Sequence, residues 1–403
     1  MRWAIPAGLA ALALSACAPS AQVETVPTPF AAPDNARCTG NGITIDTDFP
    51  AGALETCTID DAGLVTIRFA PEDEPPINCS PWYSFRVHTA MPRDVTVKLT
   101  YTACGHRYWP KSSPDGQDWK YLPKDAVELA EYSGRDQAQI KFATNGSPLF
   151  ISAQEIFAQE TYDAWLDGIE NHPALTRSLL GKSAEGRDIE MIRLGNSSAR
   201  EHVILVGRQH PPEVTGALAM VPFVEALLED SKLARRFRER FQVTAVPLLN
   251  PDGVVRGHWR HNTGGVDLNR DWGKFTQPET RLMGDLLARI DTDPEQQLRL
   301  FLDFHSTQRD VVYTLSKDLE TNPAGFTDLW LAEYRSRVPD YEVVEEPGYS
   351  AGRGVSKNWV YDQYGVPTAT FELGDETDRA LIKRVSAEAA RAMMATLLET
   401  PPE

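Results

Sequence analysis

Residues 202–217 have the sequence HVILVGRQHPPEVTGA, in which a continuous apolar run precedes two prolines and the start of a second apolar pattern. A short apolar run beside a glycine predicts a strand that is buried on both faces. His210 and Glu213 follow this predicted strand and stand at the mouth of a predicted helix. Because ligands of α/β folds gather at the carboxyl ends of strands, this pair lies where a functional site is expected.

Strand-like runs alternate with amphipathic helices from about residue 156 to residue 403. This alternation predicts an α/β domain over residues 156–403 that is built on a mainly parallel sheet. The predicted strands are 189–194, 202–206, 241–248, 298–304, 311–315 and 368–372, and the predicted helices are 162–170, 214–228, 278–289, 327–337, 356–364 and 378–398.

A third candidate metal ligand, His305, follows another predicted strand in the sequence LRLFLDFHS. The spacing of three residues lets the His210 imidazole and the Glu213 carboxylate converge on one point. Two histidines and one glutamate form the ligand set of a catalytic zinc whose fourth position is open to water. The H-x-x-E spacing alone is common, and a loop histidine near a helix start is the alternative. The strand context of both histidines favours a metal site.

Further motifs follow in a fixed order along the chain. N-P-D-G occupies residues 250–253, W-R occupies 259–260, G-V-D-x-N-R occupies 265–270 and F-E-L occupies 371–373. Together with H-x-x-E and a strand that ends in His-Ser, this series resembles the zinc carboxypeptidases of peptidase family M14. The resemblance covers about residues 160–398.

A second resemblance narrows the expected assignment to one subfamily. The segment W-Y-x-F-R at residues 82–86, ahead of the α/β region, and the stretch NPDGVVRGHWRHNTGGVDLNRDW are similar to the cytosolic carboxypeptidase subfamily and its bacterial relatives. Members of that subfamily are typically intracellular, whereas this chain carries the signals of an exported protein described below.

The resemblance implies one zinc ion, held by His210, Glu213 and His305, and attack of a zinc-activated water on the scissile carbonyl. Asp267 matches the family carboxylate that binds a ligand histidine. A carboxylate in that place fixes the tautomer of the histidine and raises its basicity. An aspartate that caps a turn is the alternative for Asp267.

Glu372 is an acid on an otherwise apolar predicted strand, which is costly unless the group is used or paired. It matches the family's general base, which takes a proton from water and delivers it to the leaving amine. A structural salt bridge is the alternative. Arg260 matches the arginine that stabilises the oxyanion, with Arg256 as the alternative, because this chemistry needs a fixed positive charge.

The resemblance also implies the residues that bind substrate. Asn269 and Arg270 match the pair that holds the terminal carboxylate, which suits the planar fork of a guanidinium. Tyr349, in EEPGYSAGRG, matches a mobile tyrosine that closes on substrate, unless it is a plain loop residue. Lys357 is expected at the base of the pocket for the departing side chain, where a cation favours Glu or Asp. Arg353 could serve instead, and a solvated lysine on an amphipathic helix is the other possibility.

These assignments predict a zinc metallocarboxypeptidase that hydrolyses the C-terminal peptide bond of peptides or proteins and prefers acidic C-terminal residues. A carboxypeptidase or amidase of cell-wall stem peptides and a zinc amidohydrolase of N-acyl amino acids are the alternatives. A non-catalytic binding lipoprotein would be expected to have lost a ligand or the base, and every matched position is filled.

The first 37 residues predict processing and export. An arginine at position 2 and an apolar run over 4–16 predict a signal peptide over 1–16, too short for a membrane span. Its end, L-S-A-C, resembles a bacterial lipobox, and this resemblance implies lipidation of Cys17. Residues 17–37 are rich in Pro and Ala and are expected to form an extended tether. We expect a membrane-anchored lipoprotein that faces the periplasm from the outer membrane; an ordinary secretory signal is the alternative.

Residues 38–155 predict a small all-β sandwich, because segments such as 95–101 alternate apolar and polar residues between turn clusters. The aromatic residues Tyr108, Trp109 and Trp119 belong either to its core or to a sugar-stacking face.

The cysteines support export. Four remain after Cys17, namely Cys38, Cys57, Cys79 and Cys104. An exported domain with four clustered cysteines predicts two disulfides, for which three pairings exist. We favour the local pairing, Cys38 with Cys57 and Cys79 with Cys104, over a zinc site because no C-x-x-C pair is present.

The 57 acidic and 40 basic residues give a formal charge of −17. Nucleic acid is not expected as a partner, because phosphate binding needs a basic surface. The sequence leaves the oligomeric state open.

Overall fold

A computed structural model of the chain describes residue 1 and residues 37–132 and 134–401. Cys17 and almost all of the predicted signal peptide and tether lie outside these residues, so lipidation stays a prediction. Within the described ranges, no helix combines the length and the apolar character that crossing a bilayer requires.

The C-terminal part contains an eight-stranded sheet with the strand order β12-β13-β15-β14-β16-β19-β17-β18. The central strands β15, β14, β16 and β19 run parallel to one another, whereas β13 pairs antiparallel with β15, and β17 pairs antiparallel with β19. The predicted α/β fold class is therefore confirmed, with a sheet that is parallel at its centre and mixed towards its edges. The strands are β12 Leu175–Lys182, β13 Asp188–Gly195, β14 Glu201–Gly207, β15 Phe241–Val246, β16 Gln297–Thr307, β17 Val311–Thr314, β18 Glu345–Pro347 and β19 Thr368–Gly374.

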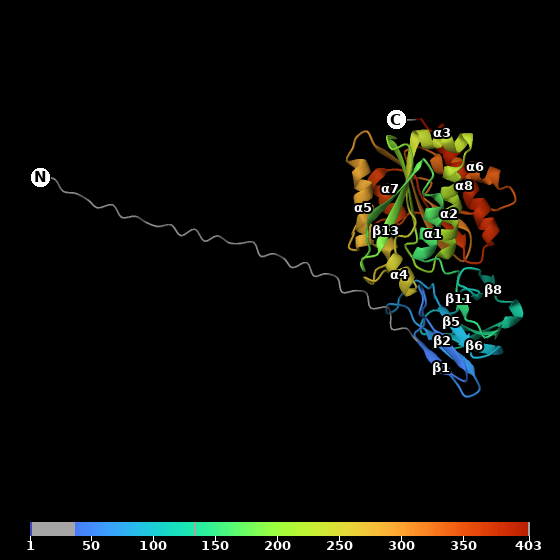
Figure 1. The fold of residues 1–403 in the computed structure, drawn as a ribbon. Helices are drawn as coiled ribbons and strands as arrows, with labels where there is room; N and C mark the ends of the chain where they lie inside the picture. Colours follow the sequence, from blue (N-terminus) through green and yellow to red (C-terminus); the bar gives the residue numbers. More distant parts are fainter. Residues whose placement is uncertain (2–36, 133, 402–403) are drawn as a thin grey trace. The chain divides into compact units, whose positions relative to one another are not determined.

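Helices cover both faces of this sheet (Figure 1). Successive residues of β14 point to opposite faces, so Val203 and Leu205 join the hydrophobic cluster with α2, α6 and α8, while Ile204 and Val206 join the cluster with α5 and α7. A strand with apolar residues on both faces needs such a cover on each side. The helices are α1 Gln159–Ile169, α2 Val214–Leu228, α3 Lys232–Arg240, α4 Pro251–Arg256, α5 Pro278–Asp291, α6 Phe326–Arg337, α7 Ser356–Tyr364 and α8 Arg379–Glu399.

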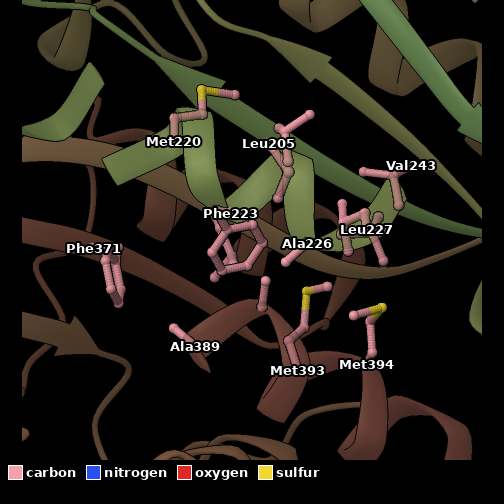
Figure 2. Packing of buried hydrophobic residues seen from close by; sticks show 14 of the residues in the cluster. Leu205, Met220, Phe223, Ala226, Leu227, Val243, Phe371, Ala389, Met393 and Met394 are labelled. Atoms are coloured by element: carbon pink, nitrogen blue, oxygen red, sulfur yellow. The ribbon is translucent and has the colours of Figure 1, made fainter. Parts of the chain in front are cut away.

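The core under α2 fixes the helix that follows Glu213. Figure 2 shows Phe371 of β19 to the left of Phe223 of α2, and the small residue Ala226 of α2 above Ala389 of α8. The Phe223 ring centroid is 6.5 Å from that of Phe371. Burial of one phenylalanine contributes about 1.5–3 kcal/mol to stability, so this packing holds α2 firmly on the parallel strands.

The N-terminal part contains two β-sheets. One has the order β1-β2-β5-β11-β7-β8 and the other β3-β4-β6-β10-β9, and buried side chains of both sheets form one hydrophobic cluster. Disulfides join Cys38 to Cys57 and Cys79 to Cys104, so the predicted local pairing is confirmed. The strands are β1 Cys38–Gly40, β2 Ile43–Asp46, β3 Thr56–Ile59, β4 Leu64–Phe69, β5 Ser84–Thr89, β6 Arg93–Tyr101, β7 Lys111–Ser113, β8 Lys120–Tyr121, β9 Val127–Tyr132, β10 Arg135–Thr144 and β11 Leu149–Ser152.

The aromatic residues that could form a sugar-stacking face do not share one exposed surface. Tyr108 is fully buried in the core. Trp109 and Trp119 are partly buried, and their indole N–H groups donate to the carbonyl oxygens of Leu122 and Gly116. The core interpretation therefore holds for Tyr108.

Five elements of the α/β part were not predicted from the sequence. They are β12, α3, the short 3-10 helix η2 (Leu268–Arg270), β18 and α4, the last of which was expected to be a turn. The sequence of α3, KLARRFRER, buries only Ala234 and Phe237, so its apolar pattern is too sparse to predict a helix. Asn250 caps α4 by accepting from the Gly253 N–H, a turn-like contact that continues here into a short helix.

One hydrophobic cluster extends from the β-sheets into the α/β part. Trp259 belongs to it, and its indole N–H donates to the Trp82 carbonyl at 3.1 Å. The Ala51 N–H donates to the Val255 carbonyl at 2.9 Å. The predicted domain boundary at residue 155 falls between β11 and α1, and it stays a prediction.

Candidate active site

The predicted metal ligands lie at the carboxyl edge of the parallel strands. His210 and Glu213 occupy the connection between β14 and α2, and His305 lies in β16, which pairs with β14. Gly216, in the first turn of α2, permits their approach, because a Cβ there would lie 2.6 Å from the His305 carbonyl oxygen. All three ligand side chains are buried.

The three donor groups converge on one another. His210 Nδ1 lies 2.9 Å from Glu213 Oε1, and His305 Nδ1 lies 2.6 Å from Glu213 Oε2 and 3.1 Å from His210 Nδ1. Donors held about 2.0–2.1 Å from a tetrahedral zinc are roughly 3.3 Å apart, so small shifts accommodate the ion. The residues therefore fit a zinc ion with a fourth position open.

The second ring nitrogen of each histidine faces a carboxylate. His210 Nε2 lies 3.0 Å from Asp267 Oδ1, and His305 Nε2 lies 2.8 Å from Asp303 Oδ2. Such contacts fix the tautomer that presents Nδ1 to a metal. Asp267 lies where it was predicted, whereas sequence reasoning missed Asp303. The available signal was an acid in an apolar strand, two residues before His305 and so on the same face.

The pKa values of two of these carboxyl groups, Glu213 and Asp267, are lowered despite their burial. Burial raises the pKa of Glu213, but His210 and His305 outweigh it and hold that pKa well below its ordinary value. Burial likewise raises the pKa of Asp267, and the neighbouring His210 and Arg260 lower it by more. An anionic carboxylate among the donors favours a cation in the site.

Arg260 lies beside the metal-binding group. Its side chain is buried, Nε donates to Asp267 Oδ2 at 2.9 Å, and Nη1 donates to Glu213 Oε1 at 3.2 Å. A guanidinium in this place can donate to an oxyanion that develops next to the metal. The alternative, Arg256, pairs with Glu185 at 2.7 Å and is not part of the lining of the cleft.

Glu372 of β19 is the register partner of His305 in β16. Burial raises the pKa of Glu372 to about 7, although His305 and Arg260 act in the opposite direction. Within the described part of the chain, no group donates a hydrogen bond to the side-chain carboxylate of Glu372. Its carboxylate is therefore open to water or substrate, as a general base requires.

A cleft of about 560 Å³ joins the predicted metal-binding and substrate-binding residues. Five basic residues line it, against three acidic ones, in a chain whose formal charge is −17. The cleft is therefore suited to anionic groups. Its lining includes His210, Glu213, Arg260, Asn269, Arg270, His305, Tyr349, Arg353, Lys357 and Glu372.

Asn269 and Arg270 lie in the short 3-10 helix η2, Leu268–Arg270. Asn269 Oδ1 accepts from the Ser356 N–H at 2.8 Å, which ties η2 to the start of α7. Gly354 has a φ of +68°, and a Cβ there would lie 2.3 Å from the Arg270 carbonyl oxygen, so this glycine permits a close backbone contact. Arg270 is partly exposed and offers its guanidinium to the cleft.

Lys357 lies in the first turn of α7 and is only 6% exposed. Its Nζ donates to the carbonyl oxygens of Thr314 and Gly348, each at 2.6 Å. Burial lowers the pKa of Lys357 to about 8. No carboxylate of the described residues forms an ion pair with it. The alternative of a solvated surface lysine is therefore wrong.

Tyr349 lines the cleft, but its hydroxyl donates to Asp362 Oδ1 of α7 at 2.5 Å. This contact raises the pKa of Tyr349 to about 12. The hydroxyl is thus engaged away from the metal-binding group, and the role of a mobile tyrosine stays a prediction.

The N-terminal β part also contributes to the cleft through two connections between its strands, which sequence reasoning missed. Asn78, Ser80 and Arg107 line it, and Arg107 Nε donates to Asp375 Oδ2 at 2.8 Å, just beyond β19. The disulfide between Cys79 and Cys104 joins the two segments that carry them. No motif marks these residues, because the contacts that bring them to the cleft join segments far apart in the sequence.

Comparison with known proteins agrees with this geometry. Residues 162–389 match the family model described as zinc carboxypeptidase. An uncharacterised protein of Zymomonas mobilis is 26% identical over 212 residues, which cover 52% of this chain and 55% of that protein. Mouse cytosolic carboxypeptidase 6 is 27% identical over 156 residues, which cover 36% of this chain and 29% of that protein. The chain thus spans about half or less of the length of these curated relatives.

A solved structure shares the fold. The metallo-carboxypeptidase from Burkholderia cenocepacia superposes with a TM-score of 0.71 at 21% identity, covering 88% of this chain and 98% of that one. The family match covers more than half of the sequence. By this match, the chain belongs to the zinc carboxypeptidase family.

Proposed function

We propose that the protein is a zinc metallocarboxypeptidase that removes the C-terminal residue of peptides or proteins and prefers acidic residues there. Family membership supports the reaction class. The observation that carries the acidic preference is Lys357, a buried ammonium in the same cleft as the metal-binding group, held only by backbone carbonyls.

Zinc, when bound, supplies a Lewis acid for the scissile carbonyl and lowers the pKa of a water. Glu372 Oε accepts the proton of the attacking water and then delivers it to the leaving amine nitrogen. The Arg260 guanidinium donates to the developing oxyanion and gains strength from its buried surroundings. Asp267 binds both Arg260 and His210, so one carboxylate aligns the oxyanion donor with a ligand.

Arg270 is proposed to bind the terminal carboxylate, and this contact makes the enzyme an exopeptidase. We expect Arg270→Ala to lower kcat/KM for peptides with free C-termini by about 10²–10³-fold, mainly through KM, since a charge-assisted fork is lost. Steady-state kinetics on paired free and C-terminally amidated peptides measure the effect. Equal weakening for both members of a pair would contradict the role.

The pocket for the departing side chain is proposed to contain Lys357. Two of its three N–H donors are bound to Thr314 and Gly348, which leaves one for a substrate. A buried cation without a carboxylate partner is costly, and a substrate carboxylate would supply that partner. The neighbouring Arg353 is exposed and adds positive charge at the cleft.

Lys357→Met is expected to remove the acidic preference while preserving the volume of the side chain. The ratio of kcat/KM for peptides ending in Glu and in Gln should fall by about 10–100-fold, because the variant loses a charge-assisted hydrogen bond in a buried site. Lys274→Met is the matched control, since Lys274 is exposed and does not line the cleft. An unchanged Glu-to-Gln ratio in Lys357→Met would disprove the pocket assignment.

One substrate panel separates the reaction classes. The zinc-loaded protein is offered peptides that vary in the last residue, peptidoglycan stem peptides and N-acyl amino acids, each with a chelator control. Release of C-terminal Glu or Asp supports the proposal. Cleavage of stem peptides alone would assign the enzyme to the cell wall, and cleavage of N-acyl amino acids alone would make it an amidohydrolase.

We further propose that the protein is exported and anchored through lipid on Cys17. The two disulfides support an oxidising compartment. Membrane fractionation of cells that express the full chain tests this location.

A further inference from the structure

Arg260 lies in a segment without regular structure, between the end of α4 at Arg256 and the start of η2 at Leu268. A side chain that must stabilise a developing charge has to be held in place before the reaction begins. Asp267 and Glu213 bind the guanidinium, but neither binds the backbone that carries it. The backbone contacts of this segment therefore decide how well Arg260 is placed.

A carboxylate from the N-terminal β part binds that backbone. Glu72 Oε2 accepts from the Trp259 N–H at 2.7 Å, and Glu72 Oε1 accepts from the Arg260 and His261 N–H groups at 2.8 and 2.5 Å. The Glu72 side chain is 6% exposed. Three consecutive N–H groups thus point at one buried anion, and hydrogen bonds to charged acceptors are among the stronger ones.

The surrounding contacts restrict the same segment further. Asp73 Oδ2 lies 2.5 Å from His261 Nδ1, and the Trp259 indole N–H donates to the Trp82 carbonyl. Glu72, Asp73 and Trp82 all belong to the connection between β4 and β5. The side chain and the backbone of Arg260 are therefore held from two different parts of the chain.

We propose that Glu72 is a positioning residue for the reaction, which acts by fixing Arg260 at the place where the oxyanion develops. This inference rests on the proposed function, and it gives the N-terminal β part a share in catalysis. A displacement of about 1 Å in a catalytic group can cost 10²-fold in rate, so the loss of this anchor should be visible in kcat.

The test uses Glu72→Gln in the full, zinc-loaded protein. The amide has nearly the same size, but it lacks the charge and replaces one of the two acceptor oxygens with an N–H₂ group, so at least one of the three backbone donors loses its acceptor. We expect kcat to fall about 10–50-fold with KM within threefold and with zinc content unchanged. Affinity for a phosphinic peptide, whose anionic oxygen mimics the developing oxyanion, should fall in parallel, whereas affinity for a substituted succinate, whose binding we assign to Arg270, should not.

Two comparisons separate positioning from general stability. Asp73→Asn, next in sequence, removes the charge that faces the His261 ring and no backbone contact, so its loss of kcat should be much smaller than that of Glu72→Gln. In an Arg260→Ala background, Glu72→Gln should cause no further loss of kcat, because residues that act through one another are not additive. Glu72→Asp keeps the charge on a shorter side chain and should give an intermediate loss of kcat. This variant provides the test if Glu72→Gln does not fold.

Normal kcat in Glu72→Gln and Glu72→Asp, or an equal loss from Glu72→Gln with and without Arg260, would overturn the inference and leave the carboxypeptidase assignment intact. A wild-type protein that binds zinc and yet hydrolyses no peptide would overturn the proposed function instead. Increased amide exchange over residues 258–262 in Glu72→Gln shows, independently of turnover, that the contact was broken.

Discussion

Glu372→Gln is expected to bind zinc normally and to lose kcat by about 10²–10⁴-fold, the range that general acid–base catalysis contributes. The amide cannot accept the proton of the attacking water, whereas the ligands His210, Glu213 and His305 are untouched. Zinc content by metal analysis and kcat on a C-terminal Glu peptide measure the two expectations together. Near-normal turnover would show that another group is the base.

The pH dependence of the wild type provides a second test of Glu372. As a base it must be ionised, so kcat/KM should fall as the pH falls through its pKa. Burial raises the pKa of Glu372 from an ordinary 4.5 to about 7 in the metal-free site, and the charge of a bound zinc acts to lower it. The acid limb should therefore have its midpoint between these values, and the residual activity of Glu372→Gln should lack that limb.

The raised pKa of Glu372 also predicts how Glu372→Gln affects the stability of the folded protein. The pKa of Glu372 is raised in the folded state, so the folded protein binds this proton more tightly than the unfolded chain does. The stability that this provides is complete below the ordinary pKa and is lost as the pH rises through about 7. In chelated samples, Glu372→Gln should therefore gain Tm relative to the wild type between pH 5.5 and pH 8. A Tm difference that does not change with pH would contradict the burial of an ionisable group here.

The sequence could predict the location of those site residues that directly follow a predicted strand. His210, Glu213 and His305 lie at carboxyl ends of strands, and the parallel pairing of β14 with β16 brings them together as expected. Glu372 could be predicted for a similar reason, because an acid in an apolar strand needs a use or a partner. The same argument applies to Asp303 and would have found it, since it too is an acid in an apolar strand.

Other residues carried no signal in the sequence. Glu72 is one of several acids in the turn PEDEPP, and only the fold shows that its carboxylate accepts three N–H groups from residues almost 190 positions away. Arg107 enters the cleft through a similar distant contact, with Asp375. Lys357 could be proposed from the resemblance, but its burial depends on the loop that supplies the Gly348 carbonyl. Contacts between segments far apart in the chain leave no periodic pattern to interpret.

His305→Ala is expected to abolish stoichiometric zinc binding and to reduce turnover to that of the chelated wild type. The variant should still fold, because the carboxylates that contact His305 keep other partners. Asp303 Oδ2 accepts from Gln209 and Ser356, and Glu213 Oε1 remains in contact with Arg260. Removing one of the ligands leaves two donors, which is too few for a stable catalytic zinc site.

Thermal unfolding with added zinc measures the loss. A ligand present at 100 times its Kd stabilises the folded state by about 2.7 kcal/mol, so the wild type should gain Tm with zinc and His305→Ala should not. Asp303→Asn provides a graded comparison, since it keeps all three ligands and removes the charge behind one of them. Its zinc affinity should fall by about 10–100-fold.

A zinc-dependent gain in Tm that survives in His305→Ala would place the metal elsewhere. Among the described residues, the other group with suitable donors is Glu72, Asp73 and His261. Both oxygens of Glu72 already accept backbone N–H groups, so a metal there would have to displace the contacts that hold the Arg260 segment. Zinc bound at that group should then raise amide exchange over residues 258–262, whereas zinc bound by His210, Glu213 and His305 should leave it unchanged.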